Sequence, residues 1–266
     1  MLLRCPPRAN PNSRVSLGRD TFVLPKSMLA VILAAGDGGR LREQTADVPK
    51  ALVGINGRPL ISYTLDSLTD AGIDDALIVV GHREEQMRSA LSDGGVRLPR
   101  ISFVPNPRFG GGASLSLRAA RRAVGEQHFL LLMSDHLLSA PIIRTLVSNW
   151  REGGPSLLAT DASEWPASYS SEATKVRFVA GSQEVAEIGK NLPAWDALDT
   201  GAFLVGPEAW AVVDAAPEDC ELSVIFGELA RRGALRGVDV SGAAWYDVDT
   251  VEDLEAASRM VEGGGR

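Results

Sequence analysis

From residue 28 to about residue 151, short apolar runs alternate with helix-like patterns, and this alternation restricts the fold more than any other feature. The apolar run at 28–35, MLAVILAA, ends at glycines. The pattern at 58–71 repeats its apolar residues at helical spacing and stops at Gly72. Strands and helices that alternate in this way form a mostly parallel sheet with helices on both faces. We therefore expect an α/β fold.

Further elements follow the same rhythm. Strands are predicted at 76–80, 101–104 and 128–135, and helices at 82–93, 114–125 and about 141–151. The second half is richer in short strands, at 156–160, 174–180, 184–189, 200–205 and 235–240, with late helices at 220–233 and 250–263. We interpret these strands as a smaller mixed-strand lobe or lid on the parallel core. Because no linker divides the chain, we expect one domain over residues 28–262.

The first 27 residues differ from the rest of the chain. They carry five basic side chains against one acid, Asp20, and three prolines before residue 12. They contain no continuous apolar stretch of the kind that a secretory signal requires, and Met28 stands where the first strand opens. We expect residues 1–27 to be a disordered tail or the result of an upstream start codon, with a targeting peptide as the less favoured alternative.

Composition excludes some classes of protein. The net charge of −7 argues against a nucleic-acid partner, which calls for a basic excess. The two cysteines, Cys5 and Cys220, have no metal-ligand spacing, and a reducing cytoplasmic setting is the default. No apolar run approaches the length of a membrane span, so we expect no membrane insertion. An acidic protein of this kind must concentrate its cations locally if it binds phosphates.

Residues 36–50 combine a glycine-rich loop with two cations, Arg40 and Lys50. A dinucleotide fingerprint fails here, because its sixth position is Leu41 and residues 54–60 offer no acid. A kinase-type phosphate loop also fails, because no lysine follows the glycines directly. A plain strand-to-helix turn would use the glycines but neither cation. The remaining design is a glycine turn whose N–H groups face a nucleotide, with both cations serving the triphosphate.

Residues 31–61 resemble the signature of the nucleotidyltransferase superfamily that joins a nucleoside triphosphate to a sugar or alcohol phosphate. The pattern is L-A-A-G-x-G-x-R-L followed by P-K-x-L-x-x-x-x-G-x-P-L-I, and this chain departs from it only at small positions such as Gly39. Four later segments are similar to the inositol-1-phosphate cytidylyltransferase branch: FLLLMSDHLL (129–138), ATKVRF (173–178), AEIGKNLPAWDALDTGAF (186–203) and WYDVDTVEDL (245–254). The resemblance covers roughly residues 28–260.

The resemblance implies a Rossmann-like sheet of the nucleotide-diphospho-sugar transferase type. It also implies a reaction in which CTP and a phosphorylated polyol, inositol 1-phosphate above all, give a CDP-alcohol and pyrophosphate. Since the branch includes domains fused to a membrane-bound CDP-alcohol phosphotransferase, a functional link to such an enzyme is implied too. Three alternatives stay open: a phosphocholine- or phosphonate-type cytidylyltransferase, a sugar-1-phosphate enzyme with another nucleoside triphosphate, and a non-catalytic nucleotide-binding subunit. The aromatic content of 6% argues against a choline pocket, which uses aromatic faces.

Site residues follow from the resemblance as well. It implies nucleotide binding by Leu33, Ala34, Ala35, Gly36, Gly38, Gly39, Arg40, Lys50, Asn106, Gly112 and Ser114. Asn106 and the run 108–117 fall where the family lines its base pocket, and the helix start at Ser114 should leave N–H groups free nearby. It implies acceptor binding by Lys190, by Asp199, Thr200 and Gly201, and more weakly by Lys175. The carboxylate of Asp199 and the hydroxyl of Thr200 suit the ring hydroxyls of a polyol. We expect Arg40, Lys50, Asp135 and Lys190 to be the catalytic residues.

Three aspartates are candidate ligands of a magnesium ion. Two anions meet in nucleotidyl transfer, which therefore calls for a divalent cation, and Mg²⁺ takes carboxylate oxygens. Asp135 stands just past an apolar strand, where a parallel sheet presents its ligand site. Asp247 and Asp249 lie two apart at a strand end, so both should point to one face. We predict a Mg²⁺ site at these aspartates and a structural or supporting role for His136.

Overall fold

The computed structural model describes residues 28–36, 48–92, 97 and 100–263. Gly38, Gly39 and Arg40 of the predicted phosphate loop lie outside the described residues. The first 27 residues, expected to be a disordered tail or the result of an upstream start codon, lie outside them too.

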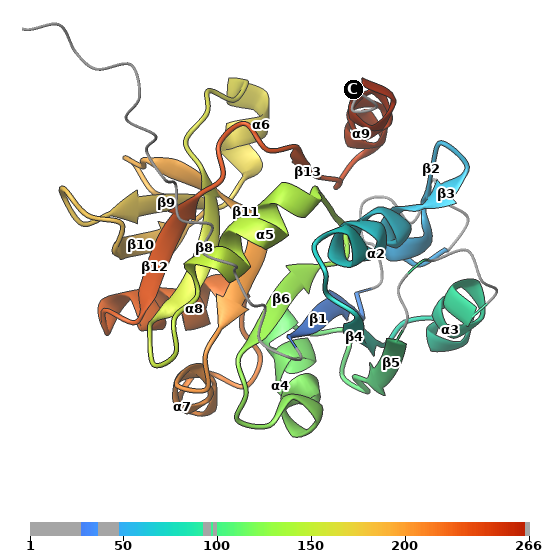
Figure 1. The fold of residues 1–266 in the computed structure, drawn as a ribbon, viewed down its shortest axis with the longest axis horizontal. Helices are drawn as coiled ribbons and strands as arrows, with labels where there is room; N and C mark the ends of the chain where they lie inside the picture. Colours follow the sequence, from blue (N-terminus) through green and yellow to red (C-terminus); the bar gives the residue numbers. More distant parts are fainter. Residues whose placement is uncertain (1–27, 37–47, 93–96, 98–99, 264–266) are drawn as a thin grey trace, which may run out of the picture.

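A nine-stranded sheet forms the centre of the molecule (Figure 1). Its parallel part contains, in spatial order, β5 (Arg100–Pro105), β4 (Asp75–Val80), β1 (Leu29–Ala34) and β6 (Phe129–Met133). β1 lies between β4 and β6, and residues 30–34 are buried on both faces of the strand. Continuous apolar runs of this kind suit a sheet whose two faces are both covered.

Helices cover both faces, as expected from the sequence. On one face, even-numbered residues of β1, such as Ile32, belong to the same apolar core as α2 (Leu60–Asp70) and α5 (Ala140–Asn149). On the other face, odd-numbered ones, such as Val31, belong to the same core as α4 (Ala113–Val124), α7 (Ala209–Ala215) and α8 (Leu222–Arg231). Successive side chains of a strand point to opposite faces, so one apolar run contributes side chains to the cores on both faces of the sheet. The prediction of an α/β fold is confirmed.

The strands of the second half continue the same sheet beyond β6. β11 (Ala197–Val205) pairs antiparallel with β6 and then branches. One branch contains β8 (Ser156–Asp161) and β12 (Leu235–Asp239), and the other contains β9 (Lys175–Phe178) and β10 (Val185–Gly189). The predicted mixed-strand part is therefore an extension of the central sheet.

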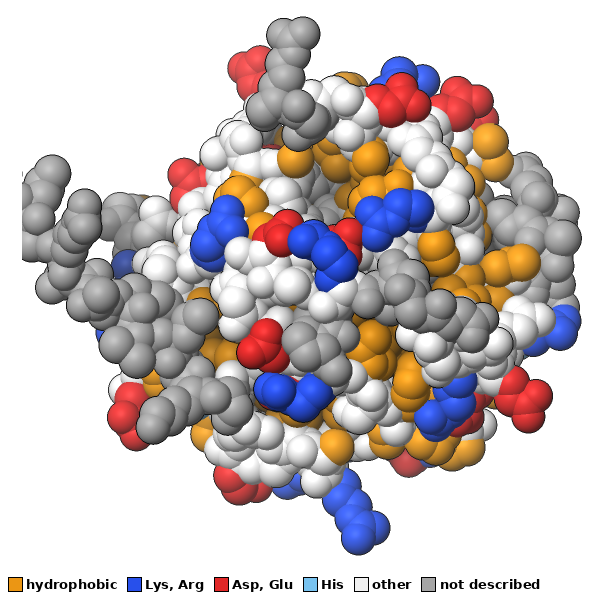
Figure 2. Space-filling model, turned by 45° about the vertical axis from the view of Figure 1, so that its right-hand side comes forward, with side chains coloured by type: hydrophobic (Ala, Val, Ile, Leu, Met, Phe, Trp, Pro, Cys, Tyr) orange, Lys and Arg blue, Asp and Glu red, His pale blue; other side chains and the backbone are white. Residues whose placement is uncertain are grey.

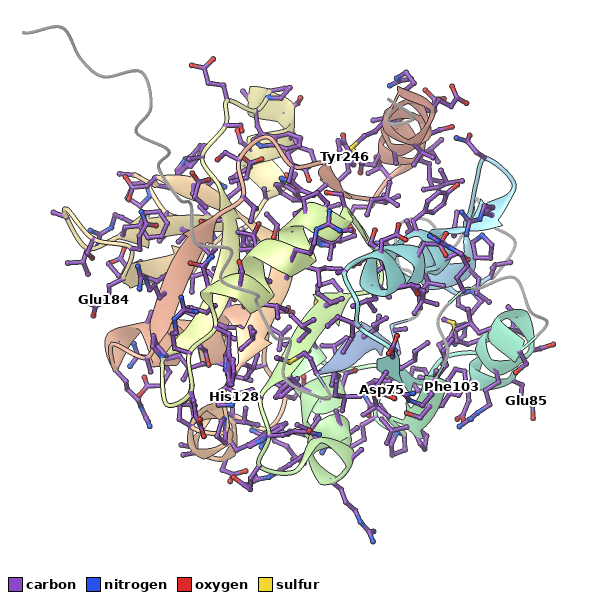
Figure 3. All side chains as sticks on the ribbon, in the orientation of Figure 1. Asp75, Glu85, Phe103, His128, Glu184 and Tyr246 are labelled. Atoms are coloured by element: carbon purple, nitrogen blue, oxygen red, sulfur yellow. The ribbon has the colours of Figure 1, made fainter. Side chains whose placement is uncertain are left out.

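The described residues contain eight further elements. They are η1 (Lys50–Leu52), β2 (Gly54–Ile55), β3 (Arg58–Pro59), α3 (Glu84–Ser92), β7 (His136–Leu138), α6 (Ala167–Glu172), β13 (Trp245–Asp247) and α9 (Val251–Gly263). β7 and β13 pair antiparallel, which the sequence reading did not foresee. Tyr246 extends from β13 (Figure 3), and its hydroxyl donates to Asp253 of α9. This pairing sets Asp247 opposite His136 across the two strands.

The surface is mixed in character. On the face shown in Figure 2, basic and acidic side chains are interspersed among apolar ones. Within the described residues, none of the helices combines the length and the apolar character that crossing a bilayer requires.

Candidate active site

A first cavity, of about 330 Å³, lies at the carboxyl end of β1. The predicted nucleotide-binding residues that line it are Leu33, Ala34, Ala35, Gly36 and Lys50. Asp135, which follows β6, and Asp249 line it too. Because the carboxyl ends of parallel strands meet at one edge of the sheet, the loops after β1 and β6 form a common site.

Lys50 is held by two carboxylates at the edge of this cavity. Its Nζ lies 2.6 Å from Asp135 Oδ2 and 2.5 Å from Asp249 Oδ1. Burial alone would lower the pKa of Lys50, but the nearby charges of Asp135, Asp247 and Asp249 outweigh it and hold this pKa above its ordinary value. Lys50 is therefore a fixed cation beside the triphosphate site predicted from the sequence.

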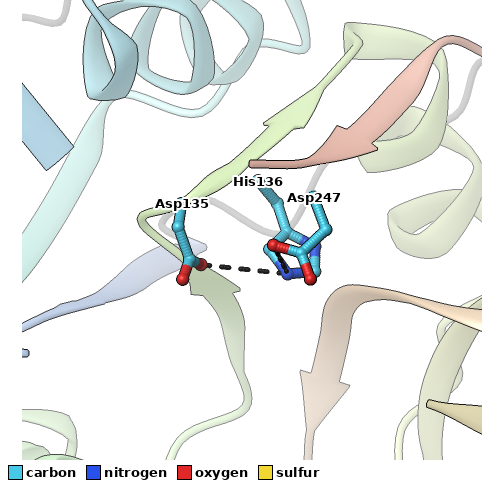
Figure 4. A group of neighbouring side chains, drawn as sticks. All are labelled: Asp135, His136 and Asp247. Atoms are coloured by element: carbon cyan, nitrogen blue, oxygen red, sulfur yellow. Dashed lines mark ion pairs between the residues drawn. The ribbon is translucent and has the colours of Figure 1, made fainter. Parts of the chain in front are cut away.

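Asp135, His136 and Asp247 meet beside Lys50 (Figure 4). The imidazole Nε2 of His136 lies 3.3 Å from Asp247 Oδ1 and 3.8 Å from Asp135 Oδ1. One ligand atom from each of the three residues lies within 4.8 Å of the other two. These residues could hold a metal ion. Asp249, the third predicted ligand, lies outside this trio, and its carboxylate accepts a hydrogen bond from Lys50, as that of Asp135 does.

The charges in the cluster shift one another's pKa values. Burial raises the pKa of Asp247, and Asp135 and Asp249 raise it further. Burial would also raise the pKa of Asp135, but Lys50 and His136 outweigh it, so this pKa is lowered. The pKa of His136 is raised in spite of burial, because Asp247 and Asp135 stabilise its protonated form. The negative charge of the site is therefore only partly offset by Lys50 and His136.

Two oxygens in the cluster fit a hard cation. Asp135 Oδ1 and Asp247 Oδ1 are buried and have no hydrogen-bond partner among the described residues. Buried polar atoms without a partner are rare, and a bound ion is one explanation for them. Carboxylate oxygens are the ligands that Mg²⁺ prefers. The donor set therefore suits a divalent cation, although Mg²⁺ itself remains a prediction.

A second cavity, of about 520 Å³, adjoins the first and shares Ala113 and Met133 with it. Its lining includes the predicted acceptor residues Lys190, Asp199 and Gly201. His136 and Asp247 line this cavity, whereas Asp135 lines the first one. The charged cluster thus lies between two adjoining cavities, where two substrates can meet.

Thr200 does not present its hydroxyl to this cavity, contrary to the role expected for it. Thr200 is fully buried, and its Oγ1 donates to the carbonyl of Ala159 at 3.0 Å. Its own carbonyl lies 2.8 Å from His136 Nδ1, and since a carbonyl only accepts, Nδ1 carries the proton. Alternate residues of a strand face opposite sides, so Asp199 and Gly201 line the cavity and Thr200 cannot.

Lys175 is a buried lysine whose donors are all used inside the protein. Its Nζ donates to the carbonyls of Ser171, Ala173 and Lys190 at 3.2, 3.1 and 2.8 Å. An ammonium group has three donors, so none is left for a substrate. The geometry gives Lys175 a structural role, in contrast to the acceptor-binding role expected from the sequence. Lys190 is exposed and lines the second cavity.

Asn106, Gly112 and Ser114, expected around the base, lie outside the lining of the first cavity. The amide nitrogen of Asn106 donates to Ser116 Oγ at 3.0 Å, and the N–H of Gly112 donates to Asp219 at 2.5 Å. Ser114 is buried, and its hydroxyl donates to the carbonyl of Glu218 at 3.0 Å. Residues 218–220 thus accept the hydrogen bonds of Gly112 and Ser114 at this helix start. The sequence analysis had expected these donors to be free for a nucleotide.

Four residues of the run 108–117, which was expected around the base, line the first cavity: Phe109, Gly111, Ala113 and Ser116. Sequence reasoning missed the aromatic wall of the second cavity. Tyr169 and Trp245 line the second, and Tyr169 Oη accepts the N–H of Asp247 at 3.0 Å. The aromatic residues beside Asp247 in WYDVDT are a signal that could have pointed to this wall.

Comparison with known proteins gives a consistent picture. The model of the MobA-like NTP transferase domain matches residues 30–198. The chain is 34% identical over 235 residues to the bifunctional IPC transferase and DIPP synthase of Aquifex aeolicus (strain VF5), covering 87% of this chain and 51% of that protein. It is 36% identical over 238 residues to the protein of the same name from Rubrobacter xylanophilus, covering 88% and 52%.

The chain therefore spans about half the length of the curated relatives it matches. Among solved structures, the inositol-1-phosphate CTP transferase from T. maritima superposes with a TM-score of 0.78 at 22% identity, covering 90% of this chain and 97% of the other. This likeness shows a shared fold.

Proposed function

Because the chain belongs to the MobA-like NTP transferase family, we propose that it transfers the cytidylyl group of CTP to inositol 1-phosphate and releases pyrophosphate. The observation that carries the proposal is the position of Asp135, His136 and Asp247 between two adjoining cavities. The names of the relatives, IPC transferase and inositol-1-phosphate CTP transferase, support the choice of both substrates.

In this reaction an oxygen of the acceptor phosphate forms a bond to the α-phosphorus of CTP. The bond between that phosphorus and the bridging oxygen breaks, and the electron pair leaves with pyrophosphate. A phosphate monoester is largely a dianion near neutral pH, so the acceptor needs no general base. The protein's task is to position two anions and to offset their repulsion.

Fixed charges of the chain meet this need. Lys50, held by Asp135 and Asp249, offers positive charge in the first cavity. Lys190 offers it to the acceptor phosphate in the second. We propose that Asp135 and Asp247 hold Mg²⁺ through the two oxygens that accept no hydrogen bond from the described residues. When bound, the ion supplies Lewis-acid stabilisation of the phosphate charge.

The second cavity suits a polyol through Asp199. The carboxylate of Asp199 accepts the N–H of Gly201 at 2.8 Å, which fixes its orientation. A fixed carboxylate can accept hydrogen bonds from ring hydroxyls, and a site built in this way rejects acceptors that lack them.

A second candidate acceptor is an amino-alcohol phosphate such as phosphocholine. Although aromatic residues are sparse in the chain, Tyr169, Phe203, Phe226 and Trp245 all line this one cavity. Aromatic faces attract quaternary ammonium groups. The aromatic lining is therefore a reason to assay phosphocholine beside inositol 1-phosphate.

The test is a panel assay of pyrophosphate release, with four nucleoside triphosphates against inositol 1-phosphate, phosphocholine, phosphoethanolamine and glucose 1-phosphate. We expect CTP with inositol 1-phosphate to give the highest kcat/KM. Equal or better turnover of phosphocholine would show that the acceptor is an amino-alcohol phosphate and not a polyol phosphate. A preference for another triphosphate would overturn the assignment of CTP as the donor.

We further propose that the CDP-alcohol is consumed by a membrane-bound CDP-alcohol phosphotransferase and that the enzyme acts in the cytoplasm. The support is that the relatives carry a second activity, DIPP synthase, in their names and are about twice as long as the matched segment. Coupled conversion by a membrane fraction from the source cells would test the link.

A further inference from the structure

Asp161 is a buried carboxylate at the end of β8 that lines neither of the two cavities. It is 2% exposed, and no lysine or arginine among the described residues forms an ion pair with it. Burial alone would raise the pKa of Asp161, but hydrogen bonds from Ser163, Trp245 and Trp165 outweigh it and hold this pKa below its ordinary value. Burying a charge without a cationic partner costs free energy, and these hydrogen bonds offset that cost.

Two indole N–H groups converge on one oxygen of this carboxylate. Trp245 Nε1 donates to Asp161 Oδ2 at 2.8 Å, and Trp165 Nε1 donates to the same oxygen at 3.0 Å. The other oxygen accepts the N–H of Ser163 at 2.8 Å. The centroids of the two indole rings lie 5.1 Å apart, with an interplanar angle of 60°. Because an indole nitrogen only donates, the orientation of both rings depends on this one oxygen.

Both tryptophans contact Tyr169 of α6, which lines the second cavity together with Trp245. The ring of Trp165 stacks on that of Tyr169 with centroids 4.6 Å apart, and the ring of Trp245 meets it edge-on at 6.0 Å. Tyr169 Oη accepts the N–H of Asp247, and no acceptor for its own proton lies among the described residues. Asp161 is thus connected to the second cavity through side chains whose orientation it fixes.

α6 is a short helix beside β13 (Figure 1), and none of its residues is fully buried. A helix of this length is not stable by itself and depends on its contacts with the rest of the protein. Its carboxyl-terminal end is fixed independently of Asp161, because Lys175 Nζ donates to the carbonyls of Ser171 and Ala173. Loss of the Asp161 contacts should therefore misplace Tyr169 without detaching the segment.

We propose that Asp161 is a positioning residue for the acceptor substrate: it orients Trp245 directly and Tyr169 through Trp165, so that both rings form one wall of the second cavity. The hydroxyl of Tyr169 then donates to an oxygen of the bound acceptor, and Trp245 lies behind this wall, next to the ring of His136. The inference rests on the proposed function only in taking the second cavity as the acceptor site, and it does not depend on which phosphorylated alcohol binds there.

The KM for inositol 1-phosphate and calorimetric titration with CTP, both with Mg²⁺ present, test the inference. Asp161→Asn keeps the side-chain size, but its amide has one oxygen, so either the indoles or the N–H of Ser163 lose their acceptor. It should raise this KM about fivefold, the value of one hydrogen bond, and leave CTP affinity close to wild type. Trp165→Leu leaves the bond from Trp245 in place but removes the ring that stacks on Tyr169, and it should raise the KM similarly. Trp165→Phe keeps a ring there and should raise it less.

A double-mutant cycle separates positioning from a general loss of stability. Tyr169→Phe keeps the ring and removes the hydroxyl, so it should raise the KM for inositol 1-phosphate about as much as Asp161→Asn does. If Asp161 acts through Tyr169, the double variant should have a KM no higher than either single variant, because the same hydrogen bond is lost in all three.

Ser156→Ala is the matched control, because Ser156 is a fully buried polar residue at the other end of β8 and lines neither cavity. Ser156 Oγ donates to Glu208 and accepts the N–H of Gly206, so the variant loses two hydrogen bonds. It should lower the melting temperature and leave the KM for inositol 1-phosphate unchanged.

A lower melting temperature with a wild-type KM in Asp161→Asn would overturn the inference, as would an equal loss of affinity for CTP or additive effects in the double variant. If Asp161→Asn does not fold, Trp165→Leu decides in the same way, with a wild-type KM as the contrary result. A wild-type protein that prefers another acceptor in the panel assay would contradict the proposed function. A rise in KM confined to that preferred acceptor would still support the role of Asp161.

Discussion

The imidazole of His136 occupies the space where a side chain at residue 201 would begin: a Cβ built on Gly201 would lie 2.4 Å from its Nδ1. The same Nδ1 donates to the carbonyl of Thr200, so one short segment of β11 positions the ring. Its Nε2 is thereby directed to Asp247 and Asp135. The absence of a side chain at residue 201 therefore helps to assemble the charged cluster between the two cavities.

Substitution of Gly201 should reveal this contact. Gly201 has a φ of 76°, and Gly181, whose φ is 73°, has open space where a Cβ would be placed. Gly181→Ala thus reports the backbone strain alone, which costs about 1–2 kcal/mol. Gly201→Ala adds the clash with His136 and should lower the melting temperature further and reduce kcat. Equal melting temperatures and full activity in both variants would show that the ring moves aside freely.

Loss of either carboxylate at the predicted metal site should impair both metal binding and turnover. Asp135→Asn and Asp247→Asn keep the side-chain size but remove the charge, and each should lower kcat on the order of a hundredfold. Calorimetric titration with Mn²⁺ should show weaker metal binding in both. Asp74→Asn, an exposed residue before β4, is the control and should change neither quantity. Full activity in a chelator would refute the metal assignment.

The two lysines of the acceptor region should behave differently. Lys190→Ala should raise the KM for the acceptor phosphate and leave CTP affinity close to wild type, because Lys190 lines only the second cavity. Lys175→Met should chiefly lower the melting temperature, because it leaves three carbonyls without their donor. If Lys190→Ala abolished CTP binding, the assignment of the two cavities would be wrong.

Asp199 should make stability depend on pH. Burial raises its pKa from 3.8 to about 6. Because the folded protein holds this proton more tightly than the unfolded chain, the contribution to stability is complete below about pH 4 and is lost as the pH rises through 6. Asp199→Asn should remove this dependence, so the difference in unfolding free energy between variant and wild type should change by about 1–3 kcal/mol between pH 4 and 7. Denaturant unfolding across this range measures it, and parallel curves would contradict the shift.

The same ionisation should affect substrate binding. A protonated Asp199 accepts fewer hydrogen bonds from ring hydroxyls, so the KM for inositol 1-phosphate should rise as the pH falls below about 6. In Asp199→Asn the KM should be high at every pH and should no longer follow this profile. A profile unchanged by the substitution would assign the titration to another group.

Local patterns in the sequence were enough to predict the parallel core and the first wall of the site. Apolar runs and helical spacing are local properties, and they predicted β1, β4, β5 and β6 and the helices beside them. The end of β1 at Leu33 to Gly36, and Asp135 just after β6, follow directly, because the carboxyl ends of parallel strands share one edge of the sheet.

Which polar side chains face a cavity depends on contacts that form only in the folded chain. Thr200 and Lys175 were expected to bind the acceptor, and Asn106 and Ser114 to lie around the base, but each of them donates hydrogen bonds to other atoms of the protein. Their partners depend on strand alternation and on contacts between distant segments, such as Ser114 with Glu218, 104 residues apart. The pairing of β7 with β13, which brings His136 to Asp247, is equally non-local. A polar group forms hydrogen bonds with whichever atoms the folded chain places near it, and the residues next to it in the sequence do not determine which atoms these are.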